Sequence, residues 1–321
     1  MGATREAWAT APGHVTGLFL PATDSRDPRG RGSRGGGVVL DAGARAVARW
    51  TPSVRPRLRV VDGSGRPLPI SREVAERLRG GRRGALEVVL THDLPVGQGF
   101  GMSAAGALAT ALAVGRLFGI PRSRAIETAH LADLFGGGGL GGVAAILGGG
   151  IEFRLRPGIP PWGEIVHRPW TGPVWIGWSG RPMPSPRALA DRSLRRRIER
   201  AARELPALLQ DRDPARLFAA SERFTDRLGL AGSALSRKIA RLRRAGAWTM
   251  QTMFGHGWLA VPPTDRVDRE LQKLLHEEGG EARRLRCAAR GPRASRSSLS
   301  PAARPRARGP ASGFPGRPVE A

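Results

Sequence analysis

The 321-residue sequence has very few of the residues on which several classes of protein depend. Cys287 is its single cysteine, which excludes an intrachain disulfide framework and a cysteine-rich zinc module. Lysine occurs only at Lys238 and Lys273, and tyrosine is absent. No apolar run reaches the roughly 18 residues that a membrane-spanning helix needs. Met1–Thr10 also lacks the basic and apolar regions of a secretory signal, so we expect a cytoplasmic protein with no membrane partner.

Positive charge, by contrast, is abundant and is carried almost entirely by arginine. The chain has 52 Lys+Arg against 27 Asp+Glu, a formal net charge of +25. Glycine (45 residues) and proline (27 residues) are also frequent, and an excess of Arg, Gly, Pro and Ala can reflect codon bias as easily as function. Charge alone would give salt-sensitive, non-specific affinity for nucleic acid. Because no base-reading motif is present, we expect no specific nucleic-acid partner.

The length and a change in composition indicate two domains. Trp8–Leu20 predicts two short strands joined by a Pro-Gly turn, and Ser71 is the expected N-cap of a short helix. A Pro/Trp/Gly-rich segment at 159–163 marks the boundary between the domains. The sequence therefore predicts an N-terminal domain over residues 1–158 and a C-terminal domain over residues 159–287.

The last part of the chain, residues 288–321, is rich in Arg, Pro, Ser and Gly and shows little periodicity. From Ala282 onward, ten arginines stand against a single acid, Glu320. Such a segment buries too little apolar surface to order itself, so we expect a disordered basic tail. Translation in a shifted reading frame would explain a tail of this composition.

Residues 94–107, Leu-Pro-Val-Gly-Gln-Gly-Phe-Gly-Met-Ser-Ala-Ala-Gly-Ala, form the most distinctive stretch of the sequence. They follow a predicted strand and open an alanine-rich helix that runs to Phe118. Glycines let the backbone turn sharply and approach a ligand closely. The free N–H groups and the dipole of the helix N-terminus favour an anion, so this pattern predicts a phosphate-binding loop.

Two common phosphate-binding motifs are excluded at this position. The Gly-x-x-x-x-Gly-Lys-Ser/Thr loop requires a lysine, and none precedes Lys238. The spacing of Gly97, Gly99 and Gly101 does not fit the dinucleotide pattern G-x-G-x-x-G. On glycine spacing alone, an ordinary glycine-rich loop in a glycine-rich protein stays an equal alternative.

The stretch 94–107 resembles the phosphate-binding motif of the GHMP kinase superfamily, Pro-x-x-x-Gly-x-Gly-Ser-Ser-Ala, in its archaeal pantoate kinase branch. Three further motifs follow the order of that branch: Pro-Gly-His-Val-Thr-Gly at 12–17, Ala-His-Leu-Ala-Asp at 129–133 and Met-Pro-Ser at 183–185. The resemblance implies the two-domain α+β GHMP kinase fold, with a ribosomal S5-like N-terminal domain and a ferredoxin-like C-terminal domain. It implies ATP-dependent phosphorylation of pantoate to 4-phosphopantoate, on the route to coenzyme A. The oligomeric state stays open, with a homodimer as one alternative.

The resemblance also assigns roles by position. ATP would be held by Pro95, Gly97, Gly99, Gly101, Met102, Ser103, Ala104 and Ala105. Ser103 and Asp133 would act in catalysis and bind Mg²⁺, with Asp133 standing where the family has the longer Glu. Pantoate would be contacted by Ser25, His130, Arg154 and Ser185. From the residues alone, each role has an ordinary alternative: a helix cap for Ser103, a solvated carboxylate for Asp133, a core side chain for His130, a surface ion pair for Arg154 and a turn for Ser185.

One departure from the family pattern affects the chemistry. The family's Gly-Leu-Gly-Asp-Val carries the acid that orients or deprotonates the substrate hydroxyl, and here that acid is replaced by Gly142. General-base help contributes about 10²–10⁴ in rate. The sequence therefore leaves open a slow enzyme, a base at another position, or an ATP-binding protein without turnover. A GHMP-type kinase of another small alcohol is the remaining alternative within the superfamily.

Overall fold

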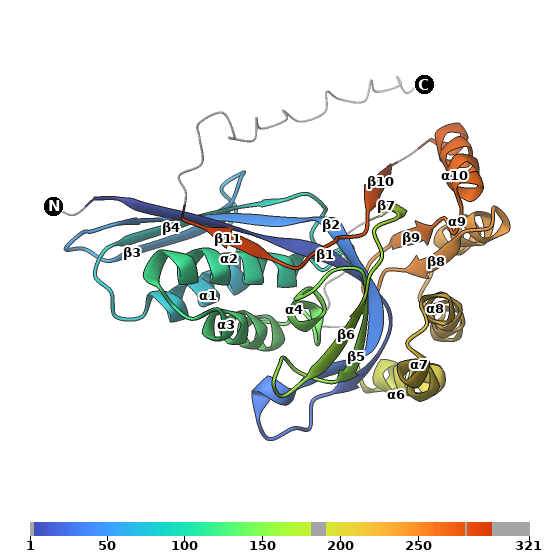
Figure 1. The fold of residues 1–321 in the computed structure, drawn as a ribbon, viewed down its shortest axis with the longest axis horizontal. Helices are drawn as coiled ribbons and strands as arrows, with labels where there is room; N and C mark the ends of the chain where they lie inside the picture. Colours follow the sequence, from blue (N-terminus) through green and yellow to red (C-terminus); the bar gives the residue numbers. More distant parts are fainter. Residues whose placement is uncertain (1–2, 181–190, 280, 297–321) are drawn as a thin grey trace, which may run out of the picture.

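A computed structural model describes residues 3–180, 191–279 and 281–296 of the chain. Two β-sheets, each with its own helices, make up this part, so the predicted α+β class is confirmed. Helices α1 and α2 lie against the first sheet with α3 packed on them, and α8 to α10 lie beside the second sheet (Figure 1). Ser185 and the motif around it fall outside the described residues.

The first sheet is built on two long strands that pair antiparallel along their length, β1 (Arg5–Ala22) and β2 (Gly32–Thr51). Its order is β11-β1-β2-β4-β3, and β3 runs parallel to β4. Two further strands extend it where β2 begins, because β5 pairs with β2 and β6 pairs with β5. The bounds are β3 (Arg57–Asp62), β4 (Ala85–His92), β5 (Ile151–Arg156), β6 (Glu164–Arg168) and β11 (Arg293–Ser295).

The Pro-Gly turn predicted within residues 8–20 is wrong, because β1 continues through it. The pairing with β2 shifts its register between Pro12 and Gly13. Proline has no N–H for the ladder, and an irregularity in the strand accommodates that loss. Directly after the shift, the N–H of His14 donates to the carbonyl of Phe100 at 3.0 Å. The irregularity therefore joins β1 to the glycine-rich loop.

Helices α1 (Pro69–Arg79), α2 (Met102–Phe118) and α3 (Arg122–Phe135) cover one face of the first sheet (Figure 1). Most of α2 is buried, because its small apolar residues let it lie between the sheet and the other two helices. Ser71 is not an N-cap: α1 begins at Pro69 after Leu68, and Ser71 is buried within the helix. The fixed φ of proline suits the first position of a helix, which explains the earlier start.

The second sheet has the order β10-β7-β9-β8. Its strands are β7 (Pro173–Trp178), β8 (Trp248–Gln251), β9 (Gly257–Val261) and β10 (Ala282–Arg286). The helices of this half are α6 (Arg192–Ala201), α7 (Leu205–Asp211), α8 (Pro214–Leu228), α9 (Ser233–Arg244) and α10 (Asp265–Glu278). Short elements complete the described part of the chain: the 3-10 turns η1 (Pro28–Gly30) and η2 (Ala202–Glu204), and α4 (Gly142–Ala145).

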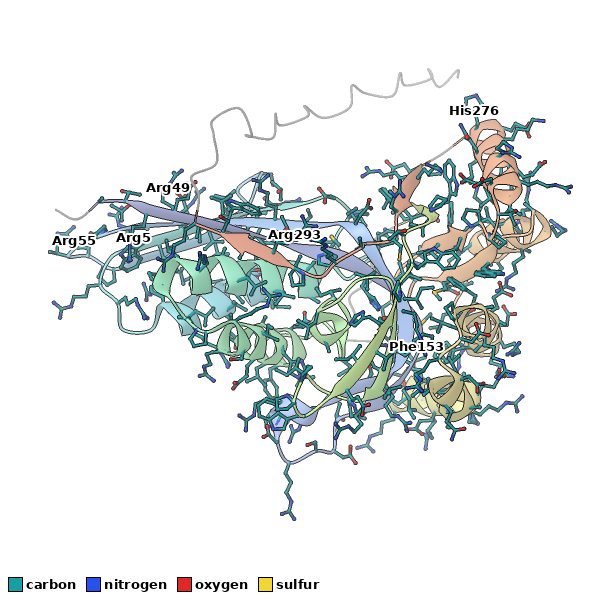
Figure 2. All side chains as sticks on the ribbon, in the orientation of Figure 1. Arg5, Arg49, Arg55, Phe153, His276 and Arg293 are labelled. Carbon is teal, nitrogen blue, oxygen red and sulfur yellow. The ribbon has the colours of Figure 1, made fainter. Side chains whose placement is uncertain are left out.

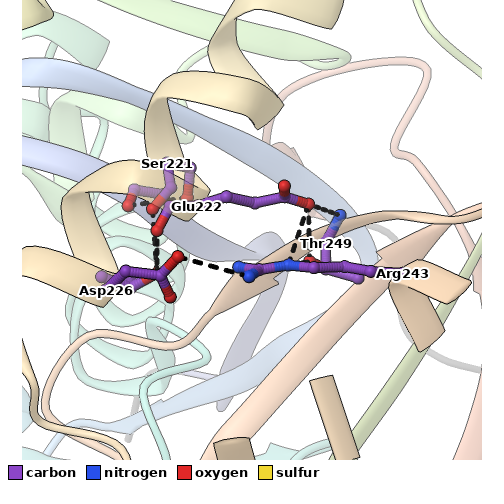
Figure 3. A network of polar contacts seen from close by, with 7 residues as sticks. Ser221, Glu222, Asp226, Arg243 and Thr249 are labelled. Atoms are coloured by element: carbon purple, nitrogen blue, oxygen red, sulfur yellow. Dashed lines mark hydrogen bonds and ion pairs between the residues drawn. The ribbon is translucent and has the colours of Figure 1, made fainter. Parts of the chain in front are cut away.

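Polar contacts fix α8 to the elements around it (Figure 3). Glu222 accepts hydrogen bonds from the N–H and the hydroxyl of Thr249 on β8, at 3.3 and 2.8 Å. Arg243 of α9 pairs with Glu222 at 3.2 Å and with Asp226 at 3.4 Å. On the other side of α8, the Ser221 hydroxyl donates to the Gly17 carbonyl of β1 at 2.9 Å. The Glu222 and Asp226 contacts hold α8 to α9 and β8, and the Ser221 contact ties the second half of the chain to the first sheet.

The domain division after residue 158 falls inside the first sheet. Strand β6 pairs with β5, so a cut at this position separates the two strands of one hairpin. The chain passes to the second sheet between β6 and β7. The Pro/Trp/Gly-rich composition at 159–163 therefore belongs to a hairpin connection rather than to a domain linker.

The prediction of disorder from residue 288 is wrong for residues 288–296. The N–H of Ala288 donates to the Val39 carbonyl at 2.8 Å, and the Ala288 carbonyl accepts from the Gly150 N–H at 2.7 Å. Strand β11 then pairs antiparallel with Trp8–Thr10 of β1. The hydrogen bonds of a β-ladder use the backbone N–H and C=O groups, and every residue except proline has both. The amino-acid composition of this segment therefore did not indicate the strand.

Arginine side chains mark the outer surface of the molecule. Figure 2 shows Arg5, Arg49 and Arg55 at the end of the first sheet that is remote from His276 of α10, and all three are exposed. Phe153 of β5, by contrast, is completely buried. Within the three described ranges, no helix combines the length and the apolar character needed to cross a membrane.

Candidate active site

The glycine-rich loop between β4 and α2 leaves the first turn of α2 open. Gly97, Gly99 and Gly101 have φ angles of 82°, 79° and 69°, in the left-handed region that favours glycine. No side chain caps this helix end, and the first helical hydrogen bond runs from the Ala105 N–H to the Gly101 carbonyl at 3.0 Å. The N–H groups of residues 102–104 therefore have no helical acceptor. Together with the helix dipole, they suit an anion.

Gln98 holds this loop between the two halves of the chain. Its side chain is only 2% exposed, and its amide donates to the Gly180 carbonyl at 3.0 Å while accepting from the His256 N–H at 3.1 Å. A Cβ at Gly99 would lie 2.6 Å from the Met253 carbonyl oxygen, so only glycine fits at this position without displacing the backbone. The loop is thus fixed by the turn that precedes β9.

A cavity of about 110 Å³ opens at the N-terminus of α2. Its walls come from β1, the start of β2, the loop before α2, the glycine run after α3, β5 and the turn before β9. The polar and charged side chains in its lining are His14, Thr16, Ser33, Ser103, Asp133 and Arg154. The structure therefore brings three of the predicted site residues with polar or charged side chains, Ser103, Asp133 and Arg154, to one cavity.

Ser103 and Asp133 are in direct contact within this cavity. The Ser103 hydroxyl donates to Asp133 Oδ1 at 2.7 Å, and Asp133 is only 2% exposed. Burial raises the pKa of Asp133 to about 7, against the Ser103 hydrogen bond, which lowers it. A Cβ at Gly138 would overlap both Asp133 Oδ1 and Ser103 Oγ, so the glycine run packs closely over the pair.

This pair fits Mg²⁺ that is shared with a nucleotide. Mg²⁺ is usually bound by one or two carboxylates, by waters and by substrate phosphates. Asp133 offers one buried carboxylate and Ser103 one hydroxyl, next to the open end of α2. Among the described residues, no group of three or more His, Cys, Asp or Glu side chains could hold a metal by itself. Phosphate oxygens would supply the remaining ligands.

Gly142 lies opposite Asp133 in the same cavity. A Cβ built at Gly142 would be 2.6 Å from Ala104 Cβ and 3.8 Å from Asp133 Oδ2. Ala104 belongs to the first turn of α2 and is buried, so it has little freedom to move away. Helix α2 therefore lies so close to position 142 that a side chain there would clash with Ala104.

Arg154 reaches the cavity from β5 as part of a buried group of three side chains. Arg154, Glu152 and His14 are 2%, 0% and 3% exposed. Glu152 Oε1 accepts from Arg154 Nη1 and lies 2.9 Å from His14 Nε2. Burial would raise the pKa of Glu152, but the Arg154 charge and the His14 hydrogen bond outweigh it and lower that pKa. Arg154 Nε has no hydrogen-bond partner and is left to bind a ligand.

The other predicted residues divide between the cavity lining and other parts of the structure. Gly99, Gly101 and Ala104 line the cavity, whereas Met102 and Ala105 are buried in the core of the first half. Ser25 and His130 do not line the cavity. The Ser25 hydroxyl donates to the Asp27 carbonyl at 3.0 Å beside η1, and His130 on α3 is 3% exposed. Burial lowers the pKa of His130, while the backbone carbonyls of Pro28 and Arg31 oppose that shift.

Sequence reasoning missed His14, Thr16, Ser33 and Gln98 as site residues. His14 and Thr16 occur in the quoted Pro-Gly-His-Val-Thr-Gly motif, which was the available signal for them. Ser33 gives no local signal, because it reaches the cavity through the pairing of β1 with β2. Gln98 lies between two loop glycines, at a position that the quoted motif leaves unspecified.

Comparisons with known proteins agree with this architecture. Residues 70–150 match the GHMP kinases N terminal domain. A pantoate kinase of Thermococcus kodakarensis is 36% identical over 275 residues, which cover 83% of this chain and 91% of that protein. A solved "Phosphotransferase related to CoA biosynthesis pathway" is 30% identical with a TM-score of 0.81, covering 91% of this chain and 99% of the other.

A more distant solved structure shows the fold alone. It is described as "MDDEF in complex with MVAPP, AMPPCP and Magnesium", has a TM-score of 0.70 and is 14% identical, covering 92% of this chain and all of the other. The two-domain GHMP kinase fold expected from the sequence is thereby confirmed. With 36% identity to a curated relative over nearly the whole of that relative, the chain belongs to the pantoate kinase family of the GHMP kinases.

Proposed function

We propose that this protein phosphorylates pantoate. The γ-phosphoryl group of ATP would pass to the 4-hydroxyl of pantoate, giving 4-phosphopantoate and ADP in the synthesis of coenzyme A. Family membership supports the reaction. The observation that carries it in this chain is one small cavity that holds both the open N-terminus of α2 and the free Nε of buried Arg154. The first suits phosphate and the second suits a carboxylate.

The nucleotide would occupy the α2 side of the site. The free N–H groups of residues 102–104 would bind its phosphates, with the Ser103 hydroxyl beside them. A second, more open depression of about 690 Å³ lies next to the loop and is lined by Pro95, Val96, Asp62 and Trp178. Its mixture of apolar and polar groups suits a nucleoside, and the loop would then lie along the phosphates between the two spaces.

Pantoate would occupy the β5 side. Arg154 Nε donates to its carboxylate, and the Ser33 hydroxyl faces the same space: a Cβ at Gly141 would lie 2.7 Å from Ser33 Oγ and 3.2 Å from Arg154 Nε. Glu152 holds the guanidinium in place through Nη1. Substrate contacts by Ser25, His130 and Ser185 stay predictions, since the first two do not line the cavity and the third is outside the described residues.

Mg²⁺, when bound with ATP, supplies charge neutralisation for the transferred phosphoryl group. Asp133 and Ser103 are the residues that would hold it, because they offer the oxygen ligands nearest the open end of α2. Phosphoryl transfer depends mainly on positioning and on charge stabilisation. The close packing of the glycine run over Asp133 and Ser103 keeps both oxygens in place.

The test is ADP release by the purified chain with ATP, Mg²⁺ and pantoate, compared with shikimate, homoserine and mevalonate. Mass spectrometry of the product identifies 4-phosphopantoate. A matched pair of variants addresses the substrate carboxylate: Arg154→Lys changes the buried arginine, and Arg156→Lys changes an exposed arginine two residues later on β5 that pairs with Glu164 at 3.1 Å. We expect Arg154→Lys to raise the KM for pantoate at least about tenfold, because lysine cannot reproduce both guanidinium contacts.

The turnover assay distinguishes a pantoate kinase from a kinase of another alcohol and from a homologue without catalysis. Pantoate-dependent ADP release that is altered by Arg154→Lys but not by Arg156→Lys supports the proposal. Turnover of another alcohol in preference to pantoate identifies a different kinase of this superfamily. ATP binding without ADP release from any alcohol identifies a homologue that has lost catalysis, the alternative that Gly142 raises.

A further inference from the structure

A base that replaces the acid missing at Gly142 would have to line the cavity in which the proposed function places the substrate hydroxyl. Two of its lining side chains in the described residues can accept a proton from a hydroxyl at neutral pH: Asp133 and His14. Asp133 already accepts a hydrogen bond from Ser103 and is the carboxylate that suits Mg²⁺. His14 is the group left for proton transfer.

The surroundings of His14 determine which of its ring nitrogens carries the proton. Nε2 lies 2.9 Å from Oε1 of Glu152, and an ionised carboxylate can only accept. The proton of the neutral ring is therefore assigned to Nε2, which leaves the lone pair on Nδ1. Nδ1 lies 3.3 Å from Thr16 Oγ1, and both His14 and Thr16 line the cavity. Nδ1 is therefore the nitrogen that accepts from the Thr16 hydroxyl, and a substrate hydroxyl would take the place of that group, whereas Glu152 is completely buried and does not line the cavity.

The charged groups around the ring act in opposite directions. Burial lowers the pKa of His14, and the Glu152 hydrogen bond and charge oppose this. Arg154 on β5 and His167 on β6 lower the pKa further. The ring is therefore neutral at pH 7, and one of its nitrogens carries a lone pair that can accept a proton. Once protonated, it would face Glu152, whose negative charge stabilises the imidazolium.

We propose that His14, oriented by Glu152, is the general base of the reaction in place of the acid absent at position 142. This deepens the proposed function and rests on it. The 4-hydroxyl oxygen of pantoate forms a bond to the γ-phosphorus while its proton passes to Nδ1 of His14. The bond between that phosphorus and the bridging oxygen breaks, and its electron pair leaves with ADP. His14 returns the proton to solvent when the products depart.

The test uses the full chain and His14→Gln. The glutamine amide can still donate to Glu152, so the buried carboxylate keeps a partner, but an amide is not a base. We expect kcat to fall about 10²- to 10⁴-fold, while the dissociation constant of ATP changes less than about twofold. A control is His276→Gln, since His276 is exposed on α10 and lines neither this cavity nor the depression proposed for the nucleoside. Its kcat should equal that of the wild type.

The pH profile separates catalysis from a merely structural role. Wild-type kcat should fall as the pH drops and His14 becomes protonated, and the residual activity of His14→Gln should lack the part of that acid limb that belongs to His14. Unchanged kcat in His14→Gln, or a wild-type profile with no acid limb, overturns the inference and leaves the proposed function standing. Asp133, whose pKa burial raises to about 7, can give an acid limb of its own, so the assignment to His14 uses the difference between the two profiles. A wild-type profile with no acid limb overturns the inference even if His14→Gln fails to fold. Wild-type chain that does not turn over pantoate overturns both.

Discussion

Restoring the family's acid by Gly142→Asp should damage this protein rather than improve it. A Cβ at position 142 would be 2.6 Å from Ala104 Cβ, roughly 1 Å closer than the 3.5–4.0 Å of a favourable carbon–carbon contact. Overpacking of this kind costs about 1–3 kcal/mol. Relief of the clash would displace the first turn of α2, where Ser103 and the open N–H groups lie. We therefore expect both the melting temperature and kcat to fall.

The assay compares thermal unfolding and steady-state turnover for two alanine variants before the aspartate is introduced. At roughly 2–4 °C per kcal/mol for domains of about 150–250 residues, a cost of about 1–3 kcal/mol in Gly142→Ala should lower the melting temperature by about 2–12 °C. Gly139→Ala is the matched control in the same glycine run, because its Cβ would meet only Asp133 Oδ2 at 3.7 Å, an ordinary contact. Its melting temperature should be nearly that of the wild type.

A double variant tests the steric cause directly. Ala104→Gly removes the methyl group that a side chain at 142 would meet, although glycine within a helix costs about 1 kcal/mol. The effects of Gly142→Asp and Ala104→Gly should therefore be non-additive, with the double variant more stable than the sum of the single effects predicts. Gly142→Asp with wild-type stability and raised kcat would refute the reasoning.

Three further predictions concern other features of the site and the fold. Asp133→Asn should change how stability without Mg²⁺ depends on pH. The pKa of Asp133 is about 7 in the folded state and 3.8 in the unfolded state, so the free energy of unfolding of the wild type should fall by at most about 4 kcal/mol as the pH rises from about 4 to about 7. Thermal unfolding across that pH range should show no such fall in the variant. Gln98→Leu leaves the Gly180 carbonyl and the His256 N–H without their partner, so it should cost about 1–3 kcal/mol and raise the KM for ATP; unchanged values of both would contradict a clamping role. A chain ending at Pro292 lacks β11, and its melting temperature should be lower than that of a chain ending at Arg296; equal values would show that β11 adds nothing to stability.

Local patterns allowed much of the fold and part of the site to be predicted. The loop glycines and the small apolar residues of α2 carry their information within a short segment, so the helix and its open N-terminus follow from residues 94–118 alone. Pro12-Gly13 misled the prediction, because a dipeptide typical of turns is here accommodated within β1 through its pairing with β2. Strand β11 was missed for the same reason: its pairing, not its composition, defines it.

The parts of the site that could not be predicted depend on contacts between distant segments. His14 and Glu152 are separated by 138 positions and meet only because β1 and β5 both pair with β2. The sequence shows that Gly142 lacks a carboxylate, but not that Ala104 fills the space a side chain would need. The family motifs indicated Ser25 and His130, yet these two side chains lie beside η1 and not in the cavity lining.

The pairing of β11 with β1 has a consequence for synthesis on the ribosome. Trp8 pairs with Ser295, so β1 is translated long before the strand that pairs with its outer edge. During translation, the outer edge of β1 at Trp8–Thr10 has unpaired backbone groups, and open edges of this kind favour association between nascent chains. Contacts of such large sequence separation also slow folding. The first sheet therefore begins with the earliest residues of the chain and is completed only when Arg293–Ser295 have emerged.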